Sequence, residues 1–288
     1  MNEATAEQDE KKDFVPENPD ELYGKLIKLV RENMTENDVS LVEKAYFIAK
    51  KAHEGQFRFS GEPYIIHPVS VAIILYNLGM DGESMAAALL HDVVEDTDMT
   101  KENIQEEFGE DVANLVEGVT KLGKVPIFTK EEQQAENVRK MLMAMSQDIR
   151  VIIIKLADRI HNMRTLSFMR PDKRREKAQE TLEIYAPIAH RLGIRGVKEE
   201  LEDLAISYLD PVAYKEIRDR LEQQQSKRKE YLDSIQKKIS ERIKLVVPNA
   251  SISGRIKSVH GIYRKMYMQG KSFDEIYDIY AVRIIVDD

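Results

Sequence analysis

Residues 88–97, ALLHDVVEDT, decide how this chain folds and what it could do. The apolar run AAALL at 86–90 passes directly into one histidine and three acidic residues. Side chains three and four positions apart share a face of an α-helix, so a helix over 83–95 predicts that His91, Asp92, Glu95 and Asp96 lie together. Like charges on one face repel each other, and a bound cation would neutralise them. A solvated acidic helix end with an incidental histidine is the alternative.

A second segment, VIIIKLADRIHNMRTL at 151–166, combines an apolar stripe with a polar one. The apolar stripe has helical spacing and is predicted to face the core: Ile152, Leu156, Ile160 and Met163. Asp158, Asn162 and Thr165 border it at i, i+4 and i+7. A carboxylate in such a run needs a partner, because burying an unpaired charge is costly. That partner is either a metal ion or a basic residue such as Arg159.

A third segment, RFSGEPYIIHP at 58–68, lies upstream of both. His67 precedes Pro68, which favours the first turn of a helix. Arg58 and Ser60 flank a Gly-Glu-Pro turn, where an arginine could hold a phosphate or stack on a base; an ordinary surface arginine is the alternative. Imidazoles and carboxylates together suit divalent ions such as manganese, iron or zinc. The candidate ligands are His67, His91, Asp92 and Asp158.

The composition is that of an ordinary globular helical protein. The chain has 288 residues and a formal net charge of −8, with 42% hydrophobic and 33% charged residues. It has no cysteine, which excludes disulfides, zinc–thiolate sites and cysteine catalysis. The acidic balance argues against nucleic-acid binding, and the sequence predicts no membrane span and no secretory signal. We therefore expect a cytoplasmic protein of undetermined oligomeric state.

Helical periodicity dominates the chain up to about residue 193, after an acidic segment (1–20) that we expect to be a mobile tail. The predicted helices are 22–34, 39–55, 67–79, 83–95, 100–107, 109–121, 130–145, 148–166 and 173–192. Residues 196–245 are highly charged and predict long solvated helices, either a passive spacer or a relay between domains. From 246 a strand and turn, a helix around 255–268 and a strand over 277–288 are expected. A sheet needs more strands, so we expect the chain to stop just inside a second domain.

The three segments, in this order, resemble the hydrolase domain of the RelA/SpoT homologue family, which makes and destroys guanosine tetra- and pentaphosphate. AHEGQFRFSGEPYIIHP at 52–68, ALLHDVVEDT and KLADRIHNMRTL at 155–166 carry that likeness. GRIKSVHGIYRKM at 254–266 and FDEIYDIYAVRIIV at 273–286 resemble the opening of the family's synthetase domain. The resemblance implies a mainly α protein. It comprises an all-helical HD-type hydrolase domain (21–195), a helical connector (196–245) and the truncated start of an α/β synthetase domain (246–288).

The resemblance also assigns roles residue by residue. It makes His67, His91, Asp92 and Asp158 ligands of manganese, and Glu95 and Asp96 the acidic pair that orients or activates water. Nucleotide-pocket positions correspond to Arg58, Ser60, Asn162 and Thr165. Synthetase positions correspond to Arg255, Lys257, Lys265 and Asp278. The sequence departs from the family pattern at Phe59, where a basic residue is common, and at Ser258 and His260, where histidine and tyrosine are frequent.

The expected activity is manganese-dependent hydrolysis of the 3′-pyrophosphate of (p)ppGpp to GDP or GTP and pyrophosphate. The alternatives are an HD-domain phosphohydrolase of another nucleotide and a regulatory fragment whose hydrolase is silent. Synthesis of (p)ppGpp from ATP is not expected of this chain.

Overall fold

The computed structural model describes residues 17–286, except for 124–138, 140–142, 144–146, 248 and the side chains of 122–123, 225–233 and 236. The helix expected over 130–145 lies almost entirely outside the described residues, as does most of the segment 1–20. The chain divides into two compact units, Met1–Gly193 and Ile194–Asp288.

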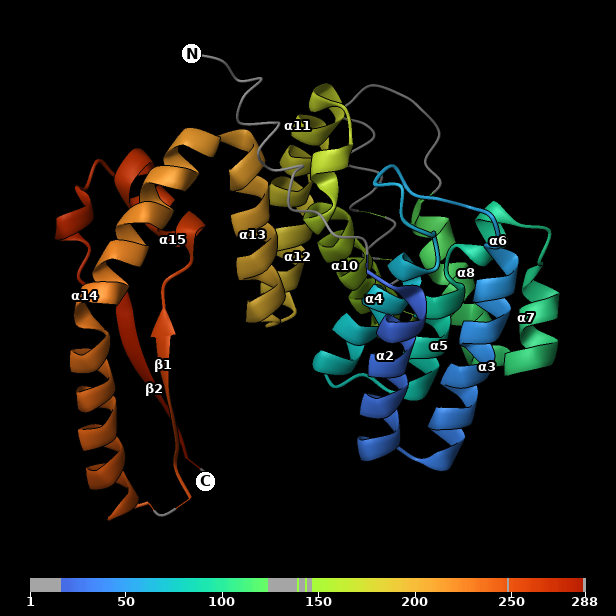
Figure 1. Ribbon diagram of the computed structural model, residues 1–288, viewed down its shortest axis with the longest axis horizontal. Coiled ribbons are helices and arrows are strands. Elements are labelled where there is room, and N and C mark those ends of the chain that lie inside the picture. The colour runs from blue at the N-terminus through green and yellow to red at the C-terminus, as the bar shows by residue number, and fades with distance from the viewer. Residues whose placement is uncertain (1–16, 124–138, 140–142, 144–146, 248, 287–288) are drawn as a thin grey trace. The chain divides into compact units, whose positions relative to one another are not determined.

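Every regular element in the described residues of the first unit is a helix, coloured from blue to yellow in Figure 1. This confirms the mainly α fold class. Its helices are α2 (Pro19–Asn33), α3 (Glu36–Ala52), α4 (Ile66–Asn77), α5 (Gly82–Leu90), α6 (Val93–Asp96), α7 (Lys101–Phe108), α8 (Glu110–Gly123), α10 (Ile149–Arg164), the 3₁₀ turn η1 (Leu166–Phe168), α11 (Pro171–Glu180), the π-helical η2 (Thr181–Tyr185) and α12 (Ala186–Arg191).

Local chemistry determines where several of these helices begin. The Thr35 hydroxyl accepts the backbone N–H of Asp38, whose carboxylate accepts that of Thr35, which forms a capping box at the start of α3. Thr100 and Asn103 repeat the arrangement at α7. Reciprocal caps of this kind satisfy N–H groups that have no partner within the helix.

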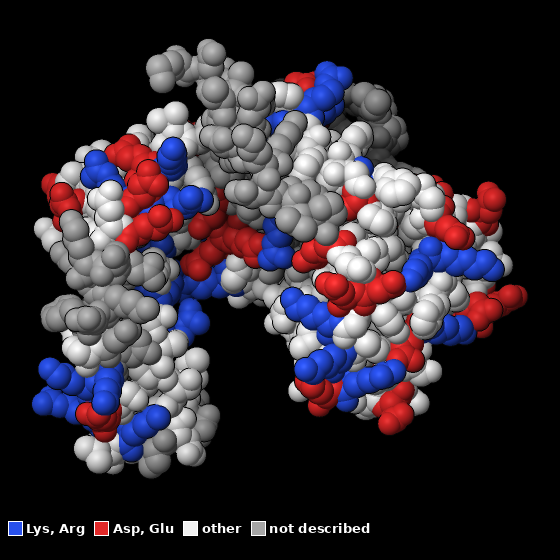
Figure 2. Space-filling model, in the orientation of Figure 1, with Lys and Arg blue, Asp and Glu red and all other residues white. Residues whose placement is uncertain are grey.

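The core of the first unit is centred on α5, which packs against α3, α4 and α8, while α10 packs against α4 and α8. Because α5 is covered on several sides, all nine of its residues except Glu83 are buried. The predicted stripe of α10 is confirmed, since Ile152, Leu156, Ile160 and Met163 are at most 2% exposed. On the face shown in Figure 2, basic and acidic side chains are interspersed over this unit. Among the described residues, none of the helices is both long and apolar enough to cross a membrane.

The helix predicted over 83–95 is wrong in one respect: α5 ends at Leu90, and α6 begins only at Val93. His91 Nδ1 lies 2.7 Å from the carbonyl oxygen of Ala88, so the side chain competes for a carbonyl in the last turn. The helix predicted over 173–192 is likewise divided, because the π-helical turn Thr181–Tyr185 separates α11 from α12.

The second unit begins with two helices, α13 (Arg195–Leu209) and α14 (Pro211–Lys244). Strand β1 (Ser251–Ile256) pairs antiparallel with β2 (Tyr280–Ile285), from Ser251↔Ile285 to Ile256↔Tyr280. Between them lie α15 (Val259–Tyr263), the π turn η3 (Arg264–Met268) and the 3₁₀ turn η4 (Phe273–Glu275). The helix predicted around 255–268 starts later, because Arg255 and Ile256 still pair with β2. A small core joins α14, α15 and η4: Ile217, Val259, Ile262, Phe273, Ile276 and Ile279.

Candidate functional site

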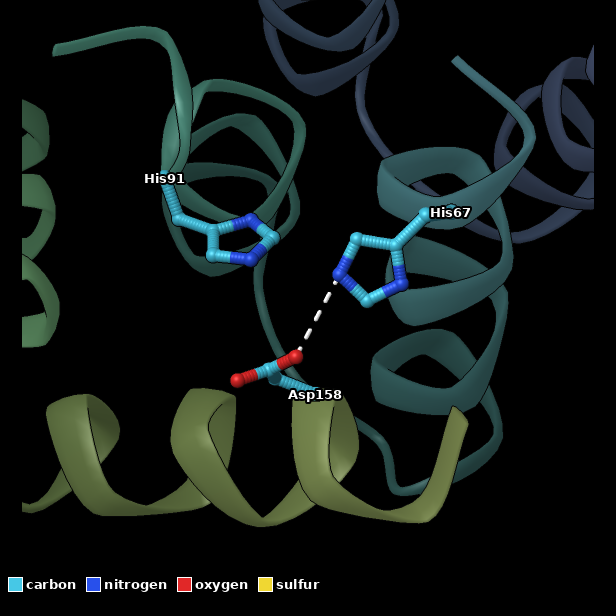
Figure 3. A group of neighbouring side chains, drawn as sticks. All are labelled: His67, His91 and Asp158. Atoms are coloured by element: carbon cyan, nitrogen blue, oxygen red, sulfur yellow. Dashed lines mark ion pairs between the residues drawn. The ribbon is translucent and has the colours of Figure 1, made fainter. Parts of the chain in front are cut away.

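Three buried side chains from three helical segments meet at one point of the first unit (Figure 3). His67 lies in the first turn of α4, His91 directly follows α5, and Asp158 lies in the middle of α10. Each offers one ligand atom, and these atoms lie within 4.8 Å of one another. His67 Nε2 is 3.3 Å from Oδ1 of Asp158. All three residues are at most 4% exposed, so the group is part of the core.

Asp92, the fourth predicted ligand, lies beside this group. Its Oδ1 is 3.2 Å from His91 Nε2, and its Oδ2 is 3.7 Å from His67 Nε2. Tyr64 donates a hydrogen bond from its hydroxyl to the same Oδ2 at 2.7 Å. The structure therefore brings together all four residues that the sequence analysis selected.

The protonation states of His67, Asp92 and Asp158 suit the binding of a cation. Burial, helped by the neighbouring Arg58 and His91, lowers the pKa of His67 to about 4, against the opposing effect of Asp158. Burial favours the neutral form of Asp158, yet Lys155 and His67 outweigh it and hold the pKa of that carboxyl well below its ordinary value. The pKa of Asp92 is also lowered, because His91 and His67 outweigh its burial. A neutral imidazole thus faces two ionised carboxylates at neutral pH.

His91 provides a direct test of whether these residues fit a metal ion. Its Nδ1 faces a carbonyl oxygen, which only accepts hydrogen bonds, so Nδ1 carries the proton and Nε2 has a free lone pair. This Nε2 is buried and has no hydrogen-bond partner among the described residues. A buried nitrogen lone pair next to two carboxylates is the environment that a borderline divalent ion satisfies. The residues therefore fit a metal.

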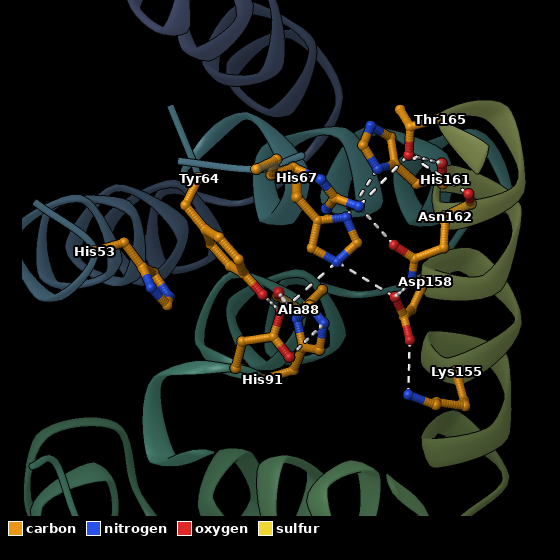
Figure 4. Close-up of polar contacts among 12 residues, drawn as sticks. His53, Tyr64, His67, Ala88, His91, Lys155, Asp158, His161, Asn162 and Thr165 are labelled. Carbon is orange, nitrogen blue, oxygen red and sulfur yellow. Dashed lines mark hydrogen bonds and ion pairs between the residues drawn. The ribbon is translucent and has the colours of Figure 1, made fainter. Parts of the chain in front are cut away.

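Asp158 has two further partners on its own helix (Figure 4). Lys155 donates to Oδ2 at 2.7 Å, and the amide of Asn162 donates to Oδ1. Arg159, the basic partner considered in the sequence analysis, instead pairs with Glu180 at 3.0 Å and stacks on the ring of Tyr185. The basic residue that neutralises Asp158 in the absence of a metal is therefore Lys155.

A pocket of about 610 Å³ opens beside this group, within the size range of small-molecule sites. All four predicted nucleotide-binding residues line it: Arg58, Ser60, Asn162 and Thr165. Arg58 donates to the amide oxygen of Asn162 at 2.7 Å and to the hydroxyl of Thr165 at 3.4 Å. These contacts join segments that are about a hundred residues apart in the sequence.

The turn between α3 and α4 positions Arg58. The backbone N–H of Arg58 donates to Glu62 O, and that of Gly61 donates to Arg58 O. Gly61 has a φ of +84°, which favours glycine over residues with a side chain. Phe59, on the same turn, is 85% exposed yet lines the pocket. Three further basic side chains line the pocket: Lys155, Arg159 and Lys177.

Glu95 and Asp96 are placed differently from the other candidates. Both lie on α6 and are exposed, and the lining of the described pocket includes neither. The side-chain amide of Gln56 donates to the backbone oxygen of Asp96 at 3.4 Å. The helix break separates α6 from α5 and so ends the helical alignment of Glu95 with His91. The backbone N–H groups of Glu95 and Asp96 still donate to the carbonyl oxygen of Asp92, at 3.1 and 2.9 Å.

Three residues of this site are not among those predicted from the sequence. Tyr64 contacts Asp92, Lys155 contacts Asp158, and His161 contacts His67. Lys155 and His161 lie three positions before and after Asp158, so helical spacing could have found them. Burial, with His67 and Arg58 nearby, holds the pKa of His161 well below its ordinary value. No sequence signal distinguishes Tyr64 from an ordinary aromatic residue.

In the second unit, three of the four predicted synthetase positions meet. Lys257 and Lys265 both donate to the carboxylate of Asp278, at 2.9 and 2.7 Å. Together they lower the pKa of Asp278 to about 2. Arg255 is separate from them and pairs with Glu199 of α13 at 2.8 Å.

Comparison with known proteins agrees with this geometry. Residues 45–195 match the HD domain family, and residues 254–288 match the region found in RelA/SpoT proteins. The chain is an HD-domain protein of the RelA/SpoT family. The HD match includes all the residues of the candidate metal centre and pocket.

Individual members of the RelA/SpoT family are similar over most of this chain. The bifunctional (p)ppGpp synthase/hydrolase SpoT of Escherichia coli K12 is 50% identical over 93% of the chain and 38% of its own length. A guanosine-3′,5′-bis(diphosphate) 3′-pyrophosphohydrolase of Vibrio cholerae is 50% identical over 92% of the chain and 38% of its own length. A GTP pyrophosphokinase of Streptomyces coelicolor is 46% identical over 91% and 31%. The chain thus spans less than two fifths of each of these relatives.

Proposed function

We propose that the first unit hydrolyses the 3′-pyrophosphate of guanosine tetra- or pentaphosphate, releasing pyrophosphate and GDP or GTP. One observation carries the proposal: a buried His/His/Asp group with an unsatisfied imidazole nitrogen opens onto a pocket lined by Arg58 and further basic side chains. The names of the E. coli and V. cholerae relatives support this substrate. In the reaction, water adds to the phosphorus on the ribose 3′-oxygen, that P–O bond breaks, and the 3′-oxygen takes a proton.

We assign the metal-holding role to His67, His91, Asp92 and Asp158, and we propose manganese as the ion. A bound Mn²⁺ would polarise a phosphoryl oxygen and lower the pKa of a water molecule. Tyr64 donates a hydrogen bond of 2.7 Å to the carboxylate of Asp92, and Lys155 donates one of 2.7 Å to that of Asp158. These bonds fix the orientation of the two carboxylates. We retain Glu95 and Asp96 as candidates for holding the attacking water, because they follow Asp92 by one helical turn.

The pocket offers polar and basic side chains that could bind the nucleotide. Arg58 is held in place by Asn162 and Thr165, so its planar guanidinium can contact a phosphate or stack on the base at little entropic cost. Lys155, Arg159 and Lys177 would offset the phosphate charge. We further propose residues 21–195 as the hydrolase domain, 196–245 as a connector and 246–288 as the start of a synthetase domain.

The decisive experiment measures pyrophosphate release from ppGpp while manganese is titrated into metal-stripped protein. Release should require manganese and disappear in His91→Ala and Asp158→Ala. His190→Ala, which removes an exposed histidine, is the matched control and should retain activity. Full activity in His91→Ala would overturn the ligand assignment. Faster hydrolysis of other nucleotides in a substrate panel would overturn the substrate, and an assay with ATP and GDP would reveal synthesis.

A further inference from the structure

A second imidazole, that of His161, contacts His67 on the Nδ1 side of its ring. His161 projects from α10 one turn after Asp158, and its Nδ1 is 2.8 Å from Nδ1 of His67. The ring centroids are 4.8 Å apart and the planes are inclined by 49° (Figure 4). Both residues are buried, at 2% and 7% exposure. Among the described residues, the Nδ1 of His67 has no other hydrogen-bond partner.

A nitrogen–nitrogen contact of this length requires one proton between the two atoms. Two N–H groups facing each other would clash, and two lone pairs would repel. In one arrangement His67 donates from Nδ1 and its Nε2 has a lone pair. In the other, His161 donates and His67 carries its proton on Nε2. Both imidazoles remain neutral in either arrangement, so only the tautomers differ.

The two histidines of the candidate metal centre therefore differ in how their tautomers are set. His91 faces the carbonyl oxygen of Ala88, which can only accept, so the neutral ring carries its proton on Nδ1 and its lone pair on Nε2. His67 faces a group that can either donate or accept. Its Nε2 lies 3.3 Å from Asp158 and 3.7 Å from Asp92, so a proton there would be attracted by carboxylates when no cation is present.

We propose that His161 is the positioning residue that sets the tautomer of His67: with metal bound it accepts the Nδ1 proton of His67, and without metal it donates. This inference rests on the metal centre of the proposed function. In the metal-bound arrangement the lone pair of His67 Nε2 points at the ion, and His161 carries its proton on Nε2. Because α10 supplies both Asp158 and His161, one rigid helix holds the carboxylate in front of His67 and the acceptor behind it.

The tautomers can be observed in the wild-type protein by long-range ¹H–¹⁵N correlation spectra of its imidazoles. Zinc replaces manganese in this experiment because it is diamagnetic. The zinc-loaded protein should show His67 protonated at Nδ1 and His161 protonated at Nε2, and the metal-free protein should show the reverse. A zinc-loaded protein with His161 protonated at Nδ1 would overturn the proposal.

Substitutions test the same point by metal affinity. His161→Leu removes the acceptor at similar volume and should weaken Mn²⁺ binding about 10- to 100-fold in a titration followed by electron paramagnetic resonance. His161→Asn restores an acceptor and should recover most of this loss, which a purely packing role would not predict. His260→Leu removes a buried histidine of the second unit and should change the affinity less than threefold.

The outcomes separate this inference from the proposed function. Wild-type affinity in a folded His161→Leu variant, with ppGpp hydrolysis intact, overturns the role of His161 alone. A wild-type protein that binds no Mn²⁺ overturns the metal centre and the inference together. Folding of each variant is checked by circular dichroism, and the wild-type spectra decide the matter if His161→Leu does not fold.

Discussion

The hydroxyl of Tyr64 donates a 2.7 Å hydrogen bond to Oδ2 of Asp92. Burial and the nearby Asp92 raise the pKa of the phenol, so the donor keeps its proton at neutral pH. Tyr64→Phe leaves the ring in place but frees this carboxylate to rotate. Because partners behind a metal ligand tune its affinity, we expect Mn²⁺ binding to weaken about tenfold.

Calorimetric Mn²⁺ titration measures this effect. Tyr76→Phe removes a hydroxyl from the neighbouring helix α4 and serves as the control. An unchanged Mn²⁺ dissociation constant in Tyr64→Phe would show that Asp92 does not depend on this bond.

Lys155 should stabilise the metal-free protein. Lys155→Met leaves the buried Asp158 without its cation, which we expect to cost about 3–5 kcal/mol in the free energy of unfolding. Mn²⁺ supplies a replacement charge, so it should raise the melting temperature more in the variant than in the wild type. Lys173→Met removes an exposed pair and should cost no more than about 1 kcal/mol. An equal cost for both variants would contradict the assignment of Lys155.

The stability of the metal-free protein should fall as the pH is lowered from about 6.5 to about 4. The pKa of His67 is about 4 in the folded protein and near 6.5 when unfolded, so the unfolded state binds more protons in this window. His67 alone would account for a loss of the order of 3 kcal/mol. The lowered pKa values of Asp92 and Asp158 reduce the stability further only when the pH falls below their ordinary pKa, near 3.8.

Urea unfolding at several pH values, for the wild type and His67→Asn, measures this contribution. The variant has no imidazole at this position and should lose part of the slope. Parallel curves for the two proteins between pH 4 and 6.5 would show that His67 titrates normally.

In the second unit, Asp203 of α13 accepts the backbone N–H groups of Val259 and His260 at 3.1 and 2.8 Å. It therefore acts as the cap of α15 from a distant segment. Asp203→Ala should destabilise this unit by about 1–2 kcal/mol and accelerate hydrogen exchange at both amides. The control is Asp274→Ala, which removes an exposed carboxylate. Unchanged exchange at Val259 and His260 would contradict the capping role.

The sequence was sufficient to predict most of the described helices of the first unit, because their periodicity and caps are local properties. It predicted the core stripe of α10, and it selected four residues that the structure brings within one cluster. The order of the three motifs predicted the cluster correctly because the motifs lie on elements that pack together. His67 lies on α4, His91 follows α5 and Asp158 lies on α10, and α4 packs against both α5 and α10.

The remaining features depend on contacts that periodicity does not encode. The break after Leu90 coincides with the contact between the His91 side chain and the carbonyl oxygen of Ala88, and it places Glu95 and Asp96 on the separate short helix α6. The start of α15 depends on pairing between β1 and β2. Assigning Lys155 rather than Arg159 to Asp158 requires knowing that Glu180 and Tyr185 already engage Arg159.

Arg58, Asn162 and Asp158 form a continuous chain of hydrogen bonds from the pocket wall to the cluster. Under the proposed function, the nucleotide and the ion would each bind to one end of this chain. Whatever factor the ion adds to nucleotide affinity, the nucleotide must add to the affinity for the ion, because binding free energies are reciprocal. A nucleotide that binds more tightly when the ion is present would therefore recruit the ion when free manganese is scarce, and would thereby hasten its own hydrolysis.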